Sequence, residues 1–304
     1  MNHVLVTGAS GFLGVAVRAA LVEAGNRVTA VDIRVAPGVI AADVSEADQL
    51  DAVLSANSTI DTIIHLAAAG AGVHGLVAGA ASNTAAAVHI NVEGFVHIVE
   101  AAARHGVKKI LWSSSTTIYG PADEYSSPIG ESASLRPTTA YGATKAACEH
   151  LGPILAERLG VEIVAVRLPM VYGPGRWYGG SQAPMVALAT ALNDGNEIEV
   201  EVWDGDADWV HIWDAAAAML SLLNVSALSP AYHVVGHRGS FAELARELIH
   251  AAVEPTLATV LIVAGGAPNI PATDDSLLRN ATGWSPRFSD AASGAADYLK
   301  VIAN

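Results

Sequence analysis

The sequence contains few of the residues that secreted and metal-binding proteins depend on. It has one cysteine, Cys148, among 304 residues, which excludes a disulfide framework and fits a reducing compartment. Cys148 falls on a predicted helix, where we expect a small buried residue rather than a nucleophile. The eleven histidines form no H-E-x-x-H pattern and no cysteine-histidine cluster. We therefore expect no catalytic metal.

Charge is also scarce, and it is mostly negative. Only 15% of the residues are charged, and 30 acids against 16 bases give a net charge of −14. Such an acidic chain is not expected to bind nucleic acid or an anionic membrane. The apolar stretches 215–223 and 257–264 are too short to span a bilayer, and no signal-peptide pattern precedes the first apolar run. These features predict a soluble, cytoplasmic protein whose partner is a small molecule.

Hydrophobic residues, in contrast, make up 52% of the chain, and in its first half they form short runs that alternate with helical patterns. The runs predict buried strands at 4–7, 28–31, 62–66, 109–113 and 162–167. The helical patterns lie near 13–24, 46–55, 84–105 and 141–159. This alternation predicts an α/β fold with a Rossmann-like, doubly wound parallel sheet that is covered by helices on both faces. Ligands of such sheets bind beyond the carboxyl ends of the strands.

The second half of the chain has a less regular pattern. Its predicted elements are a loop at 172–184, helices near 184–194, 214–224 and 240–251, and strands near 197–203 and 231–235. The region 252–275 has no assignable pattern, and the small residues of 67–87 predict a loop. We expect residues 1–168 to form a cofactor-binding domain. Residues 169–304 are expected to form mostly a smaller, substrate-binding lobe, interleaved with the last strands of the main sheet.

Three glycines follow the first predicted strand at a spacing of three. Gly8, Gly11 and Gly14 separate the apolar run 4–7 from the first helical pattern. Glycines let the backbone approach a pyrophosphate, and a helix N-terminus points free N–H groups and partial positive charge at the phosphates. The spacing G-x-x-G-x-x-G differs from the dinucleotide pattern G-x-G-x-x-G, and glycine-rich turns are common. On its own, this turn is weak evidence for a bound dinucleotide.

The second predicted strand ends at an acid, Asp32, eighteen residues after Gly14. A carboxylate at this position accepts hydrogen bonds from the adenosine ribose 2′-hydroxyl and repels a 2′-phosphate. An ordinary strand-end cap is the alternative, and Arg34 leaves room for NADP. Together with the glycine turn, Asp32 predicts that the first domain binds NAD.

A row of hydroxyls and a tyrosine-lysine pair extend this pattern. Residues 113–117 read Ser-Ser-Ser-Thr-Thr at the end of a predicted strand, and Tyr141 and Lys145 share one face of a predicted helix. A tyrosine with its usual pKa of about 10 exchanges protons poorly at neutral pH. A lysine one turn away, together with an oxidised nicotinamide, favours the phenolate and lowers that pKa. Such pairs are common by chance, but one that follows the glycine turn, Asp32 and the serines predicts an acid/base catalyst.

In this order, the motifs resemble the extended short-chain dehydrogenase/reductase family, that is, the NAD-dependent epimerase/dehydratase group. The resemblance covers nearly the whole chain. Its matching positions are 7–14, 32, 43–44, 65–68, 91–94, 113–120, 141–145, 167–175, 209–214 and 283–287. It implies an NAD-dependent oxidoreductase and a homodimer formed through the helices near 91–105 and 141–159.

The resemblance also implies a role for each matched residue. The catalytic residues are Ser115, which binds the substrate oxygen, Tyr141 as general acid/base, Lys145, which holds the nicotinamide ribose and tunes Tyr141, and Asn91, which steadies the active-site helix. The cofactor-binding residues are Gly8, Gly11, Phe12, Leu13, Gly14, Asp32, Asp43, Val44, Leu66, Ala67, Ala68, Ser113, Tyr141, Lys145 and Pro169. Ser115 and Thr117 offer hydroxyls to the substrate, and His65 is expected to pack rather than to bind a ligand.

Two neighbouring residues of the predicted loop 172–184 are further candidates for substrate binding. Arg176 can bind an anionic group such as a carboxylate, and Trp177 lies beside it in the sequence. A solvated arginine on a loop is the alternative.

Three departures from the family pattern bear on the reaction. Family dehydratases carry an Asp-Glu pair after the catalytic hydroxyl, where this chain has Thr116 and Thr117, so dehydration is not expected. Nucleotide-sugar members have an asparagine where this chain has Met170. They often place an arginine for the substrate diphosphate where this chain has Ala207. The acids of 204–206 would repel a diphosphate, unless this loop points into solvent.

These departures favour a small, non-nucleotide alcohol or carbonyl compound as the substrate, such as a sugar, a sugar acid or a hydroxy acid. Hydride then moves between the substrate carbon and the nicotinamide. A nucleotide-sugar epimerase, which returns the hydride to the other face of the sugar, is the alternative enzyme. A binding protein that senses NAD without turnover is a third hypothesis, and the intact set of Ser115, Tyr141 and Lys145 argues against it.

Overall fold

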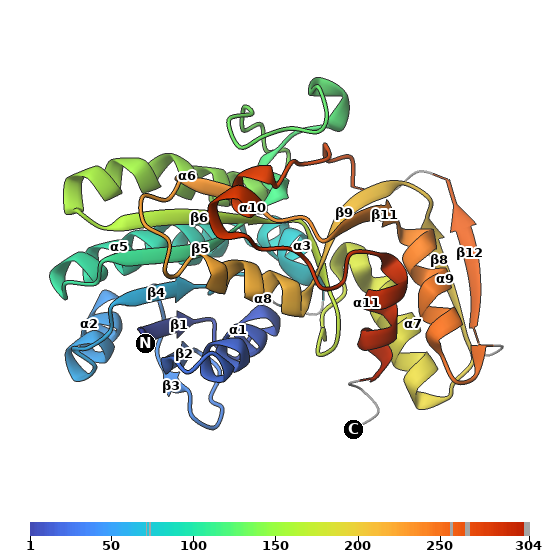
Figure 1. The fold of residues 1–304 in the computed structure, drawn as a ribbon, viewed down its shortest axis with the longest axis horizontal. Helices are drawn as coiled ribbons and strands as arrows, with labels where there is room; N and C mark the ends of the chain where they lie inside the picture. Colours follow the sequence, from blue (N-terminus) through green and yellow to red (C-terminus); the bar gives the residue numbers. More distant parts are fainter. Residues whose placement is uncertain (71, 73, 256–257, 265–267, 301–304) are drawn as a thin grey trace.

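A parallel sheet of seven strands forms the centre of the computed structural model, which describes residues 1–70, 72, 74–255, 258–264 and 268–300. The strands are β1 (His3–Thr7), β2 (Arg27–Asp32), β3 (Ile40–Ala41), β4 (Thr62–His65), β5 (Lys109–Ser115), β6 (Glu162–Leu168) and β10 (Ala231–His233). Their order in the sheet is β10-β6-β5-β4-β1-β2-β3, and Figure 1 labels β1 to β6. The predicted α/β fold is confirmed, and all five strands predicted in the first half are present.

Helices cover both faces of this sheet. One apolar layer packs the sheet against α1 (Phe12–Glu23) and α8 (Ile212–Ser221). The other packs it against α2 (Ala47–Ala56), α5 (Gly94–Arg104) and α6 (Ala140–Leu159). Cys148 is buried in this second layer, as expected for a core residue. Both layers consist mainly of aliphatic side chains, which suits strands that are buried on both faces.

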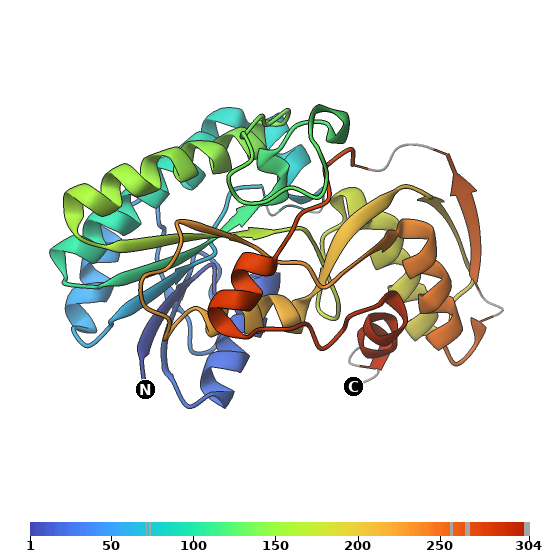
Figure 2. The same ribbon diagram turned by 45° about the horizontal axis from the view of Figure 1, so that its top comes forward.

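A smaller lobe lies beside the carboxyl ends of the central strands (Figures 1 and 2). Its helices are α7 (Ala183–Asp194), α9 (Phe241–Ala251) and α11 (Ala291–Lys300), and its strands are β7 (Met170–Tyr172), β8 (Ile198–Trp203), β9 (Asp206–His211), β11 (His237–Ser240) and β12 (Ala258–Val263). A separate apolar cluster, with Tyr172, Trp209 and Phe241 at its centre, holds the lobe together. Three elements of the second half belong to the main domain instead. Strand β10 pairs in the main sheet, α8 packs against α1, and α10 (Ser276–Thr282) packs near β10.

The loop predicted at 67–87 is wrong for most of its length. The structure has α3 (Gly75–Ser82) there, followed by α4 (Thr84–Val88); residues 71 and 73 lie outside the described part. Small residues predict a loop in this segment, but the alanines among them supply helix propensity. Gly79 is needed because a Cβ there would meet the backbone of Gly70. The predicted helix 84–105 is also interrupted, since α4 and α5 are joined by a π-helical turn, His89–Glu93.

The acidic segment around 204–208 is partly a strand rather than a solvent loop. Asp208 lies inside β9, where its carboxylate is buried and accepts a hydrogen bond from Arg238 of the neighbouring β11. Asp206 stays exposed. The region 252–275, which had no assignable pattern, contains β12. Over the described part of the chain, no helix is both long and apolar enough to cross a membrane.

Candidate active site

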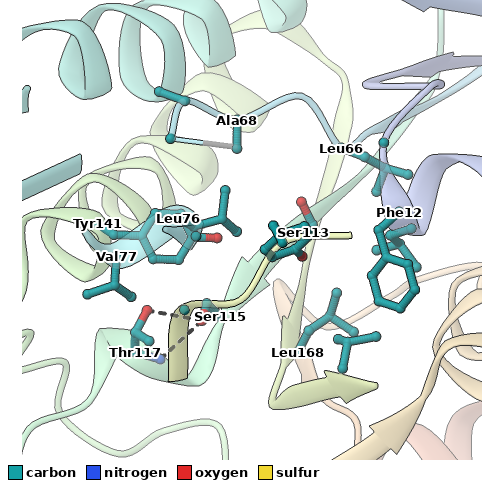
Figure 3. A pocket seen from close by; sticks show the side chains of 18 of the residues that line it. Phe12, Leu66, Ala68, Leu76, Val77, Ser113, Ser115, Thr117, Tyr141 and Leu168 are labelled. Atoms are coloured by element: carbon teal, nitrogen blue, oxygen red, sulfur yellow. Dashed lines mark hydrogen bonds between the residues drawn. The ribbon is translucent and has the colours of Figure 1, made fainter. Parts of the chain in front are cut away.

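A pocket of about 1200 Å³ opens at the carboxyl ends of β1, β2, β4, β5 and β6. This volume exceeds the roughly 300–1,000 Å³ typical for one drug-sized ligand. Every residue expected to bind cofactor or substrate lines it, apart from Lys145. Figure 3 shows Phe12 and Leu168 on one side of the cavity and Tyr141, Leu76 and Val77 on the other, with Ser113 between them.

The glycine turn forms a backbone cradle on one side of this pocket. Gly8 has a φ of +66°, and a Cβ on it would lie 2.6 Å from the amide nitrogen of Ala67 at the end of β4. A Cβ on Gly14 would fall directly on the carbonyl oxygen of Gly8. Gly11, the N-cap of α1, has no side chain to occupy the first N–H groups of that helix. The turn therefore fits the pyrophosphate of a dinucleotide, which needs close backbone approach and a free helix N-terminus.

Asp32 closes this turn from the end of β2. Its carboxylate is buried and accepts hydrogen bonds from the backbone N–H groups of Ser10 and Arg34, both at 2.9 Å. Asp32 therefore does cap the end of its strand, as the alternative interpretation expected. These hydrogen bonds also hold its carboxylate in the wall of the pocket. A carboxylate has about four acceptor positions, so two remain for ribose hydroxyls. Farther along, Asp43 accepts hydrogen bonds from the backbone and side chain of Ser45.

Two hydroxyls meet at the end of β5. The backbone N–H and the side-chain hydroxyl of Thr117 both donate to Ser115 Oγ, at 3.2 and 3.0 Å (Figure 3). With its oxygen accepting twice, Ser115 keeps its own O–H free to donate to a ligand oxygen.

The start of α6 places Tyr141 beside these hydroxyls. Thr139 caps the helix by accepting a hydrogen bond from the N–H of Gly142 at 3.0 Å. A Cβ on Gly142 would collide with the carbonyl oxygen of Thr117, so only glycine lets α6 begin against the 116–118 turn. The phenol of Tyr141 then faces the cavity (Figure 3).

Lys145 lies one helical turn after Tyr141 and beneath the pocket surface. Its Nζ donates to the carbonyl oxygen of Ser113 at 2.8 Å and lies 5.6 Å from the centre of the Tyr141 ring. Burial lowers the pKa of Lys145 to about 8. Burial also raises the pKa of Tyr141 above its ordinary value. The protein groups alone thus keep Tyr141 protonated, and the phenolate expected from the sequence needs the positive charge of oxidised nicotinamide as well.

Asn91 connects the loop after β4 to the helix that carries Tyr141. Its Oδ1 accepts a hydrogen bond from the N–H of Ala69 at 2.7 Å, and its Nδ2 donates to Thr144 Oγ1 at 2.9 Å. Thr144 in turn donates to the carbonyl oxygen of Tyr141. Asn91 itself is buried in the π-helical turn, a feature often found at functional sites.

His65 packs in the core, as expected. It is buried, and its Nδ1 forms a hydrogen bond of 2.7 Å with Thr7 Oγ1. Burial lowers its pKa to about 3, so it is neutral at physiological pH. Nowhere in the described residues do three histidine, cysteine or carboxylate side chains come together to hold a metal ion.

A segment far along the chain closes the pocket near Met170, and no sequence pattern pointed to it. Pro268 and Ile270 line the main pocket and also face Met170 and Ala207 across a space of about 20 Å³, which holds roughly one water molecule. The segment is fixed by Asp208, whose Oδ2 accepts hydrogen bonds from Thr273 N and Oγ1 at 2.8 and 2.9 Å.

Arg176 and Trp177 also line the pocket, on the segment between β7 and α7. The guanidinium of Arg176 lies 5.6 Å from the ring centre of Phe12, at the start of α1. The ring of Trp177 lies 5.3 Å from the guanidinium of Arg34, two residues after Asp32. Both side chains therefore contact elements that surround the glycine turn.

Known proteins similar in sequence belong to the epimerase/dehydratase family that the motifs resemble. The family model for the NAD dependent epimerase/dehydratase family matches residues 4–236. A UDP-glucose 4-epimerase of Streptomyces lividans is 26% identical over 313 residues, which cover 95% of this chain and 92% of that enzyme.

Solved structures share the fold at lower identity. A partial-consensus L-threonine 3-dehydrogenase aligns with a TM-score of 0.87 at 22% identity, over 99% of both chains. The UDP-glucose 4-epimerase of Thermus thermophilus, solved with NAD, aligns with a TM-score of 0.81 at 23% identity, over 98% of this chain and 97% of that one. The glycine cradle, the acid at the end of β2 and a family match over most of the chain lead to one conclusion: this protein is an NAD-dependent enzyme of the epimerase/dehydratase family.

Proposed function

We propose that the enzyme transfers hydride between NAD and a small, non-nucleotide alcohol or carbonyl compound, such as a sugar, a sugar acid or a hydroxy acid. The observation that carries this proposal is the closed wall beyond the hydroxyl cluster. Pro268 and Ile270 pack toward Met170 and Ala207 and leave room for about one water there. Bound NAD supplies the hydride acceptor or donor.

Ser115 and Tyr141 are proposed to handle the substrate oxygen. Because Ser115 Oγ already accepts two hydrogen bonds from Thr117, its O–H is directed to the ligand. Tyr141 removes the hydroxyl proton during oxidation and returns it during reduction. Lys145, whose pKa burial lowers to about 8, holds the nicotinamide ribose and favours the phenolate once the cofactor is bound. Asn91 acts as a positioning residue, since it reaches Tyr141 only through Thr144.

The charge distribution supports a substrate without a diphosphate. Beside Thr117 and Tyr141, the cavity is lined by the uncharged side chains of Leu76 and Val77 (Figure 3). Asp208, an acid of the lobe that borders the small space beside Met170, already pairs with Arg238 at 2.9 Å. A diphosphate binds best to arginine forks or helix N-termini, and this part of the wall has uncharged positions at Met170 and Ala207.

A nucleotide-sugar epimerase is the second candidate. It is favoured by the curated relatives, which are named UDP-glucose 4-epimerase and match over more than nine-tenths of this chain. The same three catalytic residues serve either reaction. The two proposals differ in whether hydride stays on the cofactor.

Absorbance of NADH separates the two candidates. Purified enzyme is incubated with NAD and a panel of sugars, sugar acids, polyols and hydroxy acids. Net formation of NADH with one of these compounds supports the dehydrogenase. Conversion of a nucleotide sugar to its epimer without net NADH, with no small compound oxidised, would overturn it.

A tyrosine variant tests the catalytic assignment. Tyr141→Phe should lower kcat by about 100- to 10,000-fold, the usual contribution of a general acid/base. The matched control is Tyr232→Phe, a buried tyrosine on β10 whose hydroxyl accepts from the N–H of Ser229. Activity of Tyr141→Phe within a few-fold of the parent would contradict the role of Tyr141.

We also propose that the enzyme is a cytoplasmic homodimer, with residues 1–168 as its NAD-binding domain and most of 169–304 as its substrate lobe. The family resemblance supports packing of α5 and α6 between two copies, and Ile154 on α6 is 63% exposed. The buried, unpaired Cys148 fits a reducing compartment. Sedimentation velocity tests the dimer, and Ile154→Asp should shift a dimer toward the monomer.

A further inference from the structure

Among the residues that the structure describes, the guanidinium of Arg176 has no acidic partner. It donates to the carbonyl oxygens of Val171 at 2.9 Å and Gly179 at 3.4 Å, and its Nε is buried with no hydrogen-bond partner. Within the described part of the chain, no carboxylate lies within ion-pair distance of it. A guanidinium has five N–H donors, so most of its hydrogen-bonding capacity is unused. Leaving such a charge desolvated and unpaired is costly, so this site is incomplete without an anion.

The surroundings of Arg176 place that anion at the glycine turn. Its guanidinium lies 4.1 Å from the ring centre of Tyr178 and 5.6 Å from that of Phe12. Phe12 is the first residue of α1, the helix whose N-terminus faces the pocket. The edge of Tyr178 also contacts the Phe12 ring, with 6.2 Å between the centres. The positive charge of Arg176 is thus held against Phe12, beside the glycine turn.

The neighbouring residues extend this segment across the mouth of the pocket. Trp177 lies over the guanidinium of Arg34 near the ribose acid Asp32. At the other end, Gly180 lies against the start of α3, because a Cβ on Gly75 would lie 3.0 Å from the Gly180 Cα. Residues 176–180 therefore reach from the end of β2, past the start of α1, to the segment after β4. The residues that would hold a dinucleotide, from Asp32 past Phe12 to Ala67, line the pocket along the same span.

We propose that Arg176 binds the pyrophosphate of NAD, and that the segment 176–180 forms the outer wall of the cofactor site. Arg176 and Trp177, which residue type alone makes candidates for substrate binding, are thereby assigned to the cofactor site. An arginine would supply charge-assisted hydrogen bonds to phosphate oxygens, in a forked geometry that lysine does not match. Arg34 is already occupied by the Ser10 carbonyl oxygen at 2.6 Å and by Trp177. The proposal concerns the cofactor and does not depend on which substrate the enzyme takes.

Binding of cofactor fragments tests this proposal without reference to turnover. The variant Arg176→Met removes the charge but keeps a long side chain against Phe12 and Tyr178. Isothermal titration measures Kd for NAD and for ADP-ribose, which has the pyrophosphate but no nicotinamide. Loss of charge-assisted hydrogen bonds should weaken both ligands by a similar factor, about 10- to 100-fold. Arg176→Lys should recover part of the loss.

Two controls keep the result interpretable. Arg246→Met changes an exposed arginine of α9 and should leave both Kd values unchanged. Thermal unfolding of each variant shows whether the fold is retained, and the Lys variant serves if the Met variant does not fold. Kd values for NAD and ADP-ribose within twofold of the parent would overturn the proposal. A raised KM for the substrate with an unchanged Kd for NAD would also overturn it, and would indicate that Arg176 binds the substrate.

Discussion

Replacing Asp208 with alanine is expected to loosen the segment 268–273 that closes the substrate side of the pocket. The side chain of Asp208 is 7% exposed. Its Oδ2 accepts from the N–H and hydroxyl of Thr273, and its Oδ1 accepts from Arg238 at 2.9 Å. Alanine removes all three hydrogen bonds and leaves the buried N–H of Thr273 without a partner.

The size of the effect follows from these contacts. Leaving a buried donor unpaired costs about 1–3 kcal/mol. The ion pair adds at most about 1 kcal/mol, because the side chain of Arg238 is 40% exposed and solvent screens it. We expect Asp208→Ala to lower the free energy of unfolding by about 1–4 kcal/mol. With an unfolding entropy near 2.1 cal/mol/K per residue, a chain of 304 residues should lose about 2–6 °C in Tm.

Calorimetry of the cofactor-free enzyme measures this change, and Asp206→Ala is the matched control. Asp206 lies on the same strand, but its side chain is 60% exposed and 4.0 Å from Arg238, so its removal should change Tm by less than about 1 °C. If Asp208→Ala were as mild as Asp206→Ala, Asp208 would not hold the segment. The double variant with Thr273→Val should cost less than the sum of the two single changes, because both remove the same contact. In activity assays, Asp208→Ala should raise substrate KM and leave the Kd of NAD unchanged.

Thr117→Val removes one of the two hydrogen bonds accepted by Ser115 and should lower kcat about 3- to 10-fold, whereas Thr117→Ser should stay near the parent in steady-state assays. Gly14→Ala puts a Cβ on the carbonyl oxygen of Gly8 and should abolish NAD binding in calorimetry; binding at parental affinity would refute the cradle. Burial lowers the pKa of His65 to about 3, so between pH 6.5 and 3 the unfolded chain binds more protons. Stability should therefore fall as pH falls through this window, by up to about 1.4 kcal/mol per pH unit. His65→Gln should flatten that slope in urea unfolding, and an unchanged slope would show that other groups govern it.

The residues proposed to hold the cofactor could be picked out from the sequence because each of their motifs is local. Gly8 and Gly14 belong to one turn, and Tyr141 and Lys145 are one helical turn apart. Such contacts follow from the period of a helix and the geometry of a strand end. The five strands predicted in the first half are confirmed for the same reason, since buried parallel strands appear as short apolar runs.

The substrate half could not be predicted in this way, because its walls are made by distant segments. Asp208 meets Thr273 across 65 positions of sequence, and Pro268 reaches the pocket from a region without a recognisable pattern. Arg176 and Trp177 suggested a substrate site by residue type alone. Their contacts with Phe12 and Arg34 depend on how the segment after β7 folds back over α1, which no local periodicity encodes.

The groups proposed for catalysis and the wall near Met170 are held in place by different parts of the chain. Ser115, Thr117 and Tyr141, the proposed catalytic groups, are positioned by β5 and α6, where Gly142 allows close packing. The segment 268–273 is fixed mainly by Asp208 and by backbone pairing with Ile129, and none of these groups lines the cofactor cradle. Substitutions in this segment can therefore change the space near Met170 while the glycine turn and the catalytic residues keep their geometry. Ile270→Gly is expected to alter which small alcohols are oxidised and to leave the Kd of NAD within about twofold, as separate cofactor titration and substrate panels would measure. A parallel loss of NAD affinity would show that the two halves of the site are coupled.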